Sequence, residues 1–147
     1  MDRTQISCIH SDINLLNISN EIKELIVISN TGTANYIQEW NLSPYKQLHS
    51  IIIGNYCFIN VTSFIIQDLT VLEKLVIGNN NFSKSQELDY YYCKPCAQNA
   101  SFKCVNNTAL KEIQIGTYSF NNYSNCIIES KSILFHVIIR FIFSSKD

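Results

Sequence analysis

The stretch "LEKLVIGNNNF", residues 72–82, decides the fold of this chain. Apolar residues stand at its first, fourth, sixth and eleventh places, with Val76 at the fifth, and this pattern matches neither the alternation of a half-buried strand nor the 3.6-residue period of a helix. Two further stretches have the same spacing, "QLHSIIIGNYCF" ending at Phe58 and "ALKEIQIGTYSF" ending at Phe120. All three fit the template L-x-x-I/L-x-I-G-x-x-x-F, so the chain contains internal repeats.

The template divides the chain into about five units, which start near residues 22, 48, 72, 110 and 134, with an inserted loop at residues 84–100. In each unit the segment around L-x-I predicts a short strand whose two apolar side chains point inward. The following glycine supplies the backbone freedom for a turn. One unit alone cannot bury its apolar face, whereas stacked units form a continuous core. We therefore expect a single domain over residues 1–147 with parallel strands.

The template resembles the leucine-rich-repeat family, whose units begin L-x-x-L-x-L-x-x-N-x-L. "LEKLVIGNNNF" matches with Asn80 at the asparagine place, where the other two good copies have Tyr56 and Tyr118. Glycine at the seventh place with phenylalanine at the eleventh is similar to divergent repeats of protist and bacterial surface proteins. The resemblance implies a mostly β leucine-rich-repeat solenoid. Short parallel strands would line a concave face, with irregular turns or short strands on the convex side, and Asn80 would bond along the stack.

The same resemblance implies protein or ligand recognition, such as adhesion, without catalysis. The outward strand positions are then the candidate surface, because the residue between the two inward anchors is aliphatic in four of five units. An exposed apolar stripe often marks a partner site, although β-branched residues also simply suit strands, and a neighbouring domain could cover them. The candidate partner-binding residues on this face are Ile26, Ile52, Lys74, Val76, Glu112 and Gln114.

The inserted loop is the least repetitive part of the chain. Tyr90, Tyr91 and Tyr92 are further candidates for partner binding, since tyrosine is enriched at interfaces, although they could equally fold back on the repeats. Cys93 and Cys96 form a C-x-x-C pair that is compatible with zinc, redox chemistry or a disulfide. A structural zinc site needs four ligands, and no second such pair follows, so no cofactor or metal is predicted.

Charge and motifs exclude several classes of function. A formal net charge of −1 does not provide the clustered lysine and arginine that nucleic-acid binding needs. No G-x-S-x-G, P-loop, H-E-x-x-H or dinucleotide motif is present, so we do not expect an enzyme. The longest apolar run, residues 133–143, is about half of the ~20 residues that a membrane helix needs.

The compartment is left open by the sequence. No secretory signal is visible at the start of the chain. N-x-S/T sequons lean slightly toward an extracellular or cell-surface location, although an asparagine-rich chain also produces them by chance. They stand at Asn17, Asn41, Asn60, Asn81, Asn99, Asn106 and Asn122.

The run "ILFHVIIRFIF" near the end has only "SSKD" behind it, whereas terminal repeats need polar caps. This predicts self-association through an uncapped C-terminal end. It also supports an alternative to recognition, in which the chain is a scaffolding segment or a fragment of a longer repeat protein.

Overall fold

The structure is a computed structural model that describes residues 5–83, 97–121, 123–130 and 136–139, with only the backbone described at 97–99 and 136–139. Ten strands and one short helix follow one another along these residues. They are β1 (Ile6–Ile9), α1 (Asp12–Leu15), β2 (Glu24–Val27), β3 (Glu39–Asn41), β4 (Ser50–Ile53), β5 (Ser63–Gln67), β6 (Lys74–Ile77), β7 (Ala97–Val105), β8 (Glu112–Ile115), β9 (Tyr123–Glu129) and β10 (His136–Ile139).

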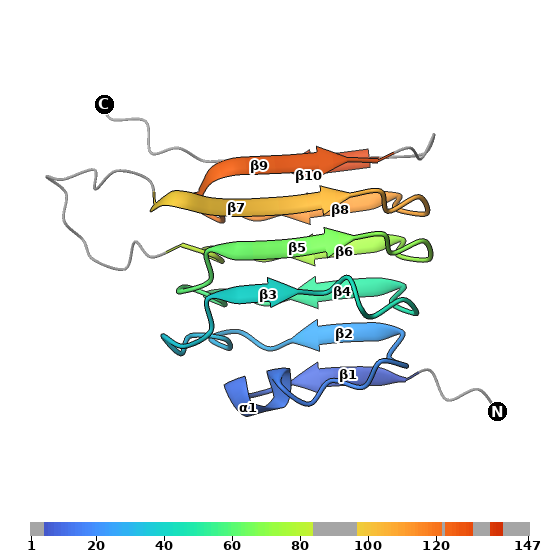
Figure 1. The fold of residues 1–147 in the computed structure, drawn as a ribbon, viewed down its shortest axis with the longest axis horizontal. Helices are drawn as coiled ribbons and strands as arrows, with labels where there is room; N and C mark the ends of the chain where they lie inside the picture. Colours follow the sequence, from blue (N-terminus) through green and yellow to red (C-terminus); the bar gives the residue numbers. More distant parts are fainter. Residues whose placement is uncertain (1–4, 84–96, 122, 131–135, 140–147) are drawn as a thin grey trace, which may run out of the picture.

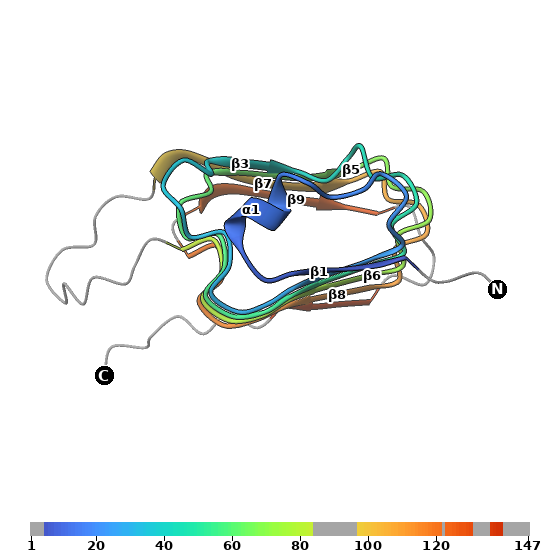
Figure 2. The ribbon, with the colours of Figure 1, turned by 90° about the horizontal axis from the view of Figure 1, so that it is seen from below.

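The strands form two parallel sheets that face each other across one core (Figures 1 and 2). The six-stranded sheet has the order β1-β2-β4-β6-β8-β10, and the four-stranded sheet has the order β3-β5-β7-β9. From β2 onward the chain passes alternately from one sheet to the other. Each pair of strands is therefore one coil of the chain, and successive coils stack on one another.

The repeated template explains why the six-stranded sheet is in register. Leu25, Ile51, Leu75 and Ile113 occupy the same place in their units and pair in sequence across the sheet. All four side chains are fully buried. A slip by one residue would turn these side chains outward, so burial of one face specifies the register.

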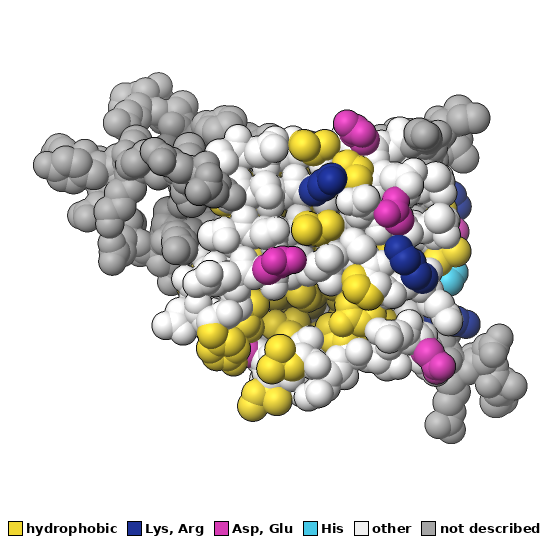
Figure 3. All heavy atoms as spheres, viewed as in Figure 1, with side chains coloured by type: hydrophobic (Ala, Val, Ile, Leu, Met, Phe, Trp, Pro, Cys, Tyr) yellow, Lys and Arg dark blue, Asp and Glu magenta, His cyan; other side chains and the backbone are white. Residues whose placement is uncertain are grey.

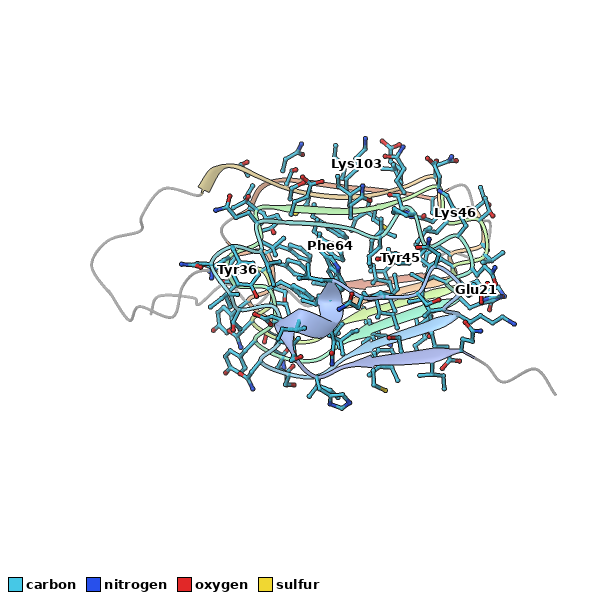
Figure 4. All side chains as sticks on the ribbon, turned by 60° about the horizontal axis from the view of Figure 1, so that its bottom comes forward. Glu21, Tyr36, Tyr45, Lys46, Phe64 and Lys103 are labelled. Carbon is cyan, nitrogen blue, oxygen red and sulfur yellow. The ribbon has the colours of Figure 1, made fainter. Side chains whose placement is uncertain are left out.

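Aromatic rings fill the space between the sheets. Phe82 stacks on Phe58 and Phe120, with ring centroids 5.2 and 4.7 Å apart, and on Phe64 of the opposite sheet at 4.5 Å. Trp40 and Phe102 extend this stack at its two ends, and Figure 4 shows Phe64 between the sheets. Because the contacts run both along and between the sheets, they tie successive coils together.

Each of the turns that follow β2, β4, β6 and β8 places two residues in the left-handed region of φ. In the coil that follows β6 these are Asn80 and Phe82, with φ of 57° and 55°. The first turn has Gly32 at the phenylalanine place, with φ of 73°. A Cβ at Gly32 would lie 2.3 Å from Cδ1 of Phe58, so glycine makes room for the first ring of the stack.

The N-terminal end of the core is covered by α1, which lies between the two layers beside β1 (Figure 2). The carboxylate of Asp12 accepts hydrogen bonds from the backbone N–H groups of Gly32 and Ala34, at 2.5 and 2.9 Å. Leu15 of this helix is buried in the core. These contacts hold the short helix against the first turn of the repeats.

The predicted leucine-rich-repeat solenoid is wrong. The finding that overturns it is the second parallel sheet, in which Trp40, Phe64, Phe102 and Cys126 pair in register, whereas irregular turns or short strands were expected on that side. The physical reason is that alternate side chains are buried in β3 and β5, as they are in the first set of strands. These segments therefore bury one face and pair in register, which irregular turns would not do.

Candidate functional site

The outward positions of the six-stranded sheet form one continuous row across the molecule. Ile26 pairs with Ile52, Ile52 with Val76, and Val76 with Gln114. Neighbouring strands lie about 4.8 Å apart, so these four side chains are adjacent on a single surface. We call this row and the polar positions beside it the outer face. Cys8 extends the row at the N-terminal end, next to Ile26.

The apolar part of the outer face is incompletely covered by its own chain. The side chain of Ile52 is 37% exposed, and those of Ile26, Val76 and Gln114 are partly buried. The polar residues near Ile52 are Ser50 on the same strand and the residues that pair with Ser50, which are Glu24 and Lys74. Burying this row against another protein would therefore remove apolar surface from water.

Charged side chains flank the apolar row with alternating sign. Glu24, Ser50, Lys74 and Glu112 are in register one place toward the strand starts. Lys111 forms an ion pair with Glu73 of the adjacent coil, N to O 3.3 Å, with both side chains about half exposed. Gln114 donates a hydrogen bond to Glu112, which joins the charged row to the apolar one. The predicted residues Lys74 and Glu112 thus lie beside Val76 and Gln114, as one surface.

The remaining predicted site residues lie outside the described part of the chain. These are Tyr90, Tyr91 and Tyr92, together with Cys93 and Cys96. The C-terminal surface predicted for self-association likewise falls on residues whose side chains are not described. These predictions stay untested.

Comparisons with known proteins add nothing to this geometry. No protein-family model, no curated protein and no solved structure matches the chain. The resemblance to leucine-rich repeats therefore has no support from these comparisons, and the function is argued from the surface alone. Among the described residues no helix is long and apolar enough to cross a membrane.

Two ladders of side-chain hydrogen bonds cross the turns, and neither was predicted at the residues that form it. An exposed ladder joins Ser29, Asn55, Asn79 and Thr117. The side-chain oxygen of each of the first three accepts from the backbone N–H of the next member at 2.8–2.9 Å. Asn80, which was expected to bond along the stack, is not part of it: its backbone is left-handed, and its two neighbours carry the ladders. The signal was present in the sequence as a polar residue directly after each glycine.

The second ladder is buried and centres on Asn81. Its Oδ1 accepts from the N–H of Cys57 at 2.6 Å, and its Nδ2 donates to the carbonyl of Gly54 at 2.7 Å. Its own N–H donates to Oγ of Ser119 at 3.1 Å, and that hydroxyl donates to the carbonyl of Gly78 at 2.7 Å. Asn81 is fully buried, so this sequon is inaccessible to a glycan in the folded chain.

The four described cysteines are all free, and two of them, Cys57 and Cys104, are buried. Burial raises the pKa of Cys57, and it raises the pKa of Cys104 to about 12 against a hydrogen bond from Asn107 that lowers it. Reactive cysteines instead have lowered pKa values. Cys8 is exposed on β1. Among the described residues no group of histidine, cysteine and acidic side chains could hold a metal ion.

A second hydrophobic patch lies near α1. Figure 3, which views the four-stranded sheet from outside, shows hydrophobic side chains gathered below that sheet, while charged side chains are spread over the rest of the face. Ile13 and Leu16 are 68% and 72% exposed at the helix, and Tyr36 nearby is 65% exposed. Lys103, in contrast, points outward from the four-stranded sheet (Figure 4). The described residues do not cover the patch near α1.

Proposed function

We propose that this chain is a non-catalytic recognition module that binds a protein partner through the outer face of its six-stranded sheet. The observation that carries the proposal is the in-register row of Ile26, Ile52 and Val76, with Ile52 37% exposed at its centre. Interfaces are typically built from an apolar centre surrounded by polar groups that exclude water. The row and its charged flank have this arrangement.

Rigidity supports the same proposal. The inward neighbours of the row, such as Ile51 and Leu75, are fully buried, and the aromatic stack lies behind them. A surface held by a packed core loses little conformational freedom when a partner binds. Lys74 and Glu112 would then select a partner by the sign of its charges, since charged rims contribute specificity more than affinity.

The test is site-specific crosslinking in cells that naturally produce the chain. A photo-crosslinking amino acid at position 52 is expected to capture a discrete protein. The same group at position 65, an outward isoleucine of β5 in the other sheet, is the matched control and should not capture it. Val76→Asp should weaken the capture at position 52 while leaving the circular dichroism spectrum unchanged.

Equal capture at both positions, or capture that Val76→Asp leaves unchanged, would remove the support for a site on this face. Absence of any discrete product at either position would favour the scaffolding role instead. The expectation that the chain is not an enzyme stays a prediction.

A further inference from the structure

A row of side chains at the turns out of the six-stranded sheet is separate from the outer face. Asn30, Tyr56, Asn80 and Tyr118 occupy the same place in successive coils, three residues after the strand. The N–H of Tyr56 donates to the carbonyl of Asn79 at 3.0 Å, and the N–H of Asn80 donates to that of Thr117 at 2.9 Å. These bonds hold the four backbones side by side, and Figure 2 shows the successive turns superposed. We call these four residues the corner row.

The corner row presents two exposed aromatic rings at a regular interval. Tyr56 and Tyr118 are 42% and 39% exposed, and one coil, that of Asn80, separates them. Neighbouring strands are ~4.8 Å apart, so the two tyrosines stand roughly 9.6 Å apart along the stack. No described residue accepts a hydrogen bond from either hydroxyl.

The turns hold both tyrosines in a left-handed backbone conformation, although their rings are not buried in the core. Both have left-handed φ, 57° and 59°, a region that asparagine tolerates better than an aromatic residue. The two other members of the row are asparagines, Asn30 and Asn80. Phe58 has the same left-handed φ, but its ring is fully buried in the stack. The turn requires the left-handed φ in all four coils, and neither exposed tyrosine ring offsets its cost by full burial as the ring of Phe58 does.

The asparagines next to the corner row have amide donors that the ladder does not use. The Oδ1 atoms of Asn55 and Asn79 accept from the backbone N–H groups of the next coil, and their Nδ2 groups take no part in these bonds. Neither Nδ2 donates to a described residue, and both side chains are exposed. The three turns at residues 54–56, 78–80 and 116–118 have no charged side chain. This surface therefore suits an uncharged ligand with ring-shaped apolar groups and free acceptors.

We propose that the corner row binds a proline-rich segment of another protein in the polyproline II conformation. That helix has three residues per turn with a ~3.1 Å rise, so prolines three residues apart lie on one face about 9.3 Å from each other. This interval matches the spacing of Tyr56 and Tyr118, and one proline ring packs on each tyrosine. The carbonyl groups of the peptide have no internal hydrogen bonds and accept from the amides of Asn55 and Asn79.

The test is a titration of the full-length ¹⁵N-labelled chain with a nine-residue oligoproline, followed by two-dimensional NMR. Chemical-shift changes are expected to cluster at residues 54–56, 78–80 and 116–118. Tyr56→Asn and Tyr118→Asn should each weaken binding roughly five- to tenfold, because each removes one aromatic contact. Both variants should fold, since asparagine already occupies this place in two other coils. Tyr36→Asn is the matched control, an exposed tyrosine outside the row, and should leave binding unchanged.

Three results would overturn the assignment. These are no shift changes with oligoproline, shift changes that both corner variants leave unchanged, or tighter binding of a soluble β-linked glucan hexamer with the same dependence on the two tyrosines. The last result would mean that the two rings stack on sugars. The proposal does not rest on the outer face, so Val76→Asp should not alter the oligoproline titration.

Discussion

Replacing Asn81 by alanine should destabilise the fold far more than its modest size suggests. The side chain satisfies two backbone groups of the preceding coil, the N–H of Cys57 at 2.6 Å and the carbonyl of Gly54 at 2.7 Å. Asn81 itself is fully buried, so bulk water cannot reach the two backbone groups after alanine removes their partner. Each buried polar group left without a partner costs about 1–3 kcal/mol. With two such groups, the free energy of unfolding should fall by about 2–6 kcal/mol.

A decrease of this size is a large share of the ~5–15 kcal/mol that stabilises a typical domain. Urea denaturation followed by circular dichroism measures it, provided that the slope of the unfolding free energy against urea is the same in both proteins. Asn79→Ala is the matched control, because Asn79 makes the analogous bond on the exposed side of the same turn. Water can replace that bond, so the control should lose less than about 1 kcal/mol.

Asn81→Ser supplies a second comparison. Ser119 occupies the same place in the next coil and, with one hydroxyl, accepts from the N–H of Asn81 and donates to the carbonyl of Gly78. A serine at position 81 should therefore restore most of the stability that alanine loses. If Asn81→Ala and Asn79→Ala unfold at the same urea concentration, or serine rescues nothing, the buried ladder does not stabilise the turns as argued.

Three further predictions concern the core. Phe82→Ala should lower the free energy of unfolding in urea by about 3–5 kcal/mol, because this fully buried ring stacks on three others; a loss below that of Asn79→Ala would contradict the stacking argument. Gly32→Ala should lower the thermal midpoint, since its Cβ would overlap Phe58 and φ is 73°, and an unchanged midpoint would refute this. Burial raises the pKa of Cys104 from its ordinary value of 9.0 to about 12 in the folded chain. The contribution of the neutral thiol to stability is therefore complete below pH 9 and is lost as the pH rises from 9 toward 12. Urea titrations from pH 8 to 10.5 should show a smaller decline in Cys104→Ala, and equal declines would count against this assignment.

The strands of the six-stranded sheet could be predicted because their signal is local. Leu75 and Ile77 are buried and Val76 lies on the outer face, as their places in the repeated template predict. A repeat was also visible around Phe64, yet a regular second sheet was not expected there. Pairing of those segments depends on tight turns in which Phe58 adopts left-handed φ, and phenylalanine does not signal such a turn.

The candidate site could likewise be predicted from the sequence only in part. The outward positions followed from the strand period, so the row of Ile26, Ile52 and Val76 could be named in advance. The ladders could not be assigned from the family pattern, which pointed to Asn80. Whether an asparagine side chain reaches the next coil depends on its backbone dihedrals, and φ is left-handed at Asn80 but not at Asn79 or Asn81.

Residues at the left-handed positions differ in whether burial of the side chain offsets the cost of the backbone conformation. A left-handed backbone costs about 1–2 kcal/mol for a residue with a Cβ. Full burial of a phenylalanine ring returns about 1.5–3 kcal/mol, so Phe82 is stabilising despite its φ. Tyr56 and Tyr118 have the same strain but leave about 40% of their surface in water. Asparagine at those two places should therefore raise the free energy of unfolding by up to about 1 kcal/mol while it weakens oligoproline binding. A substitution that improves the fold and impairs binding marks the tyrosines as binding residues, whereas a loss of stability in both variants would show that their rings are needed by the fold.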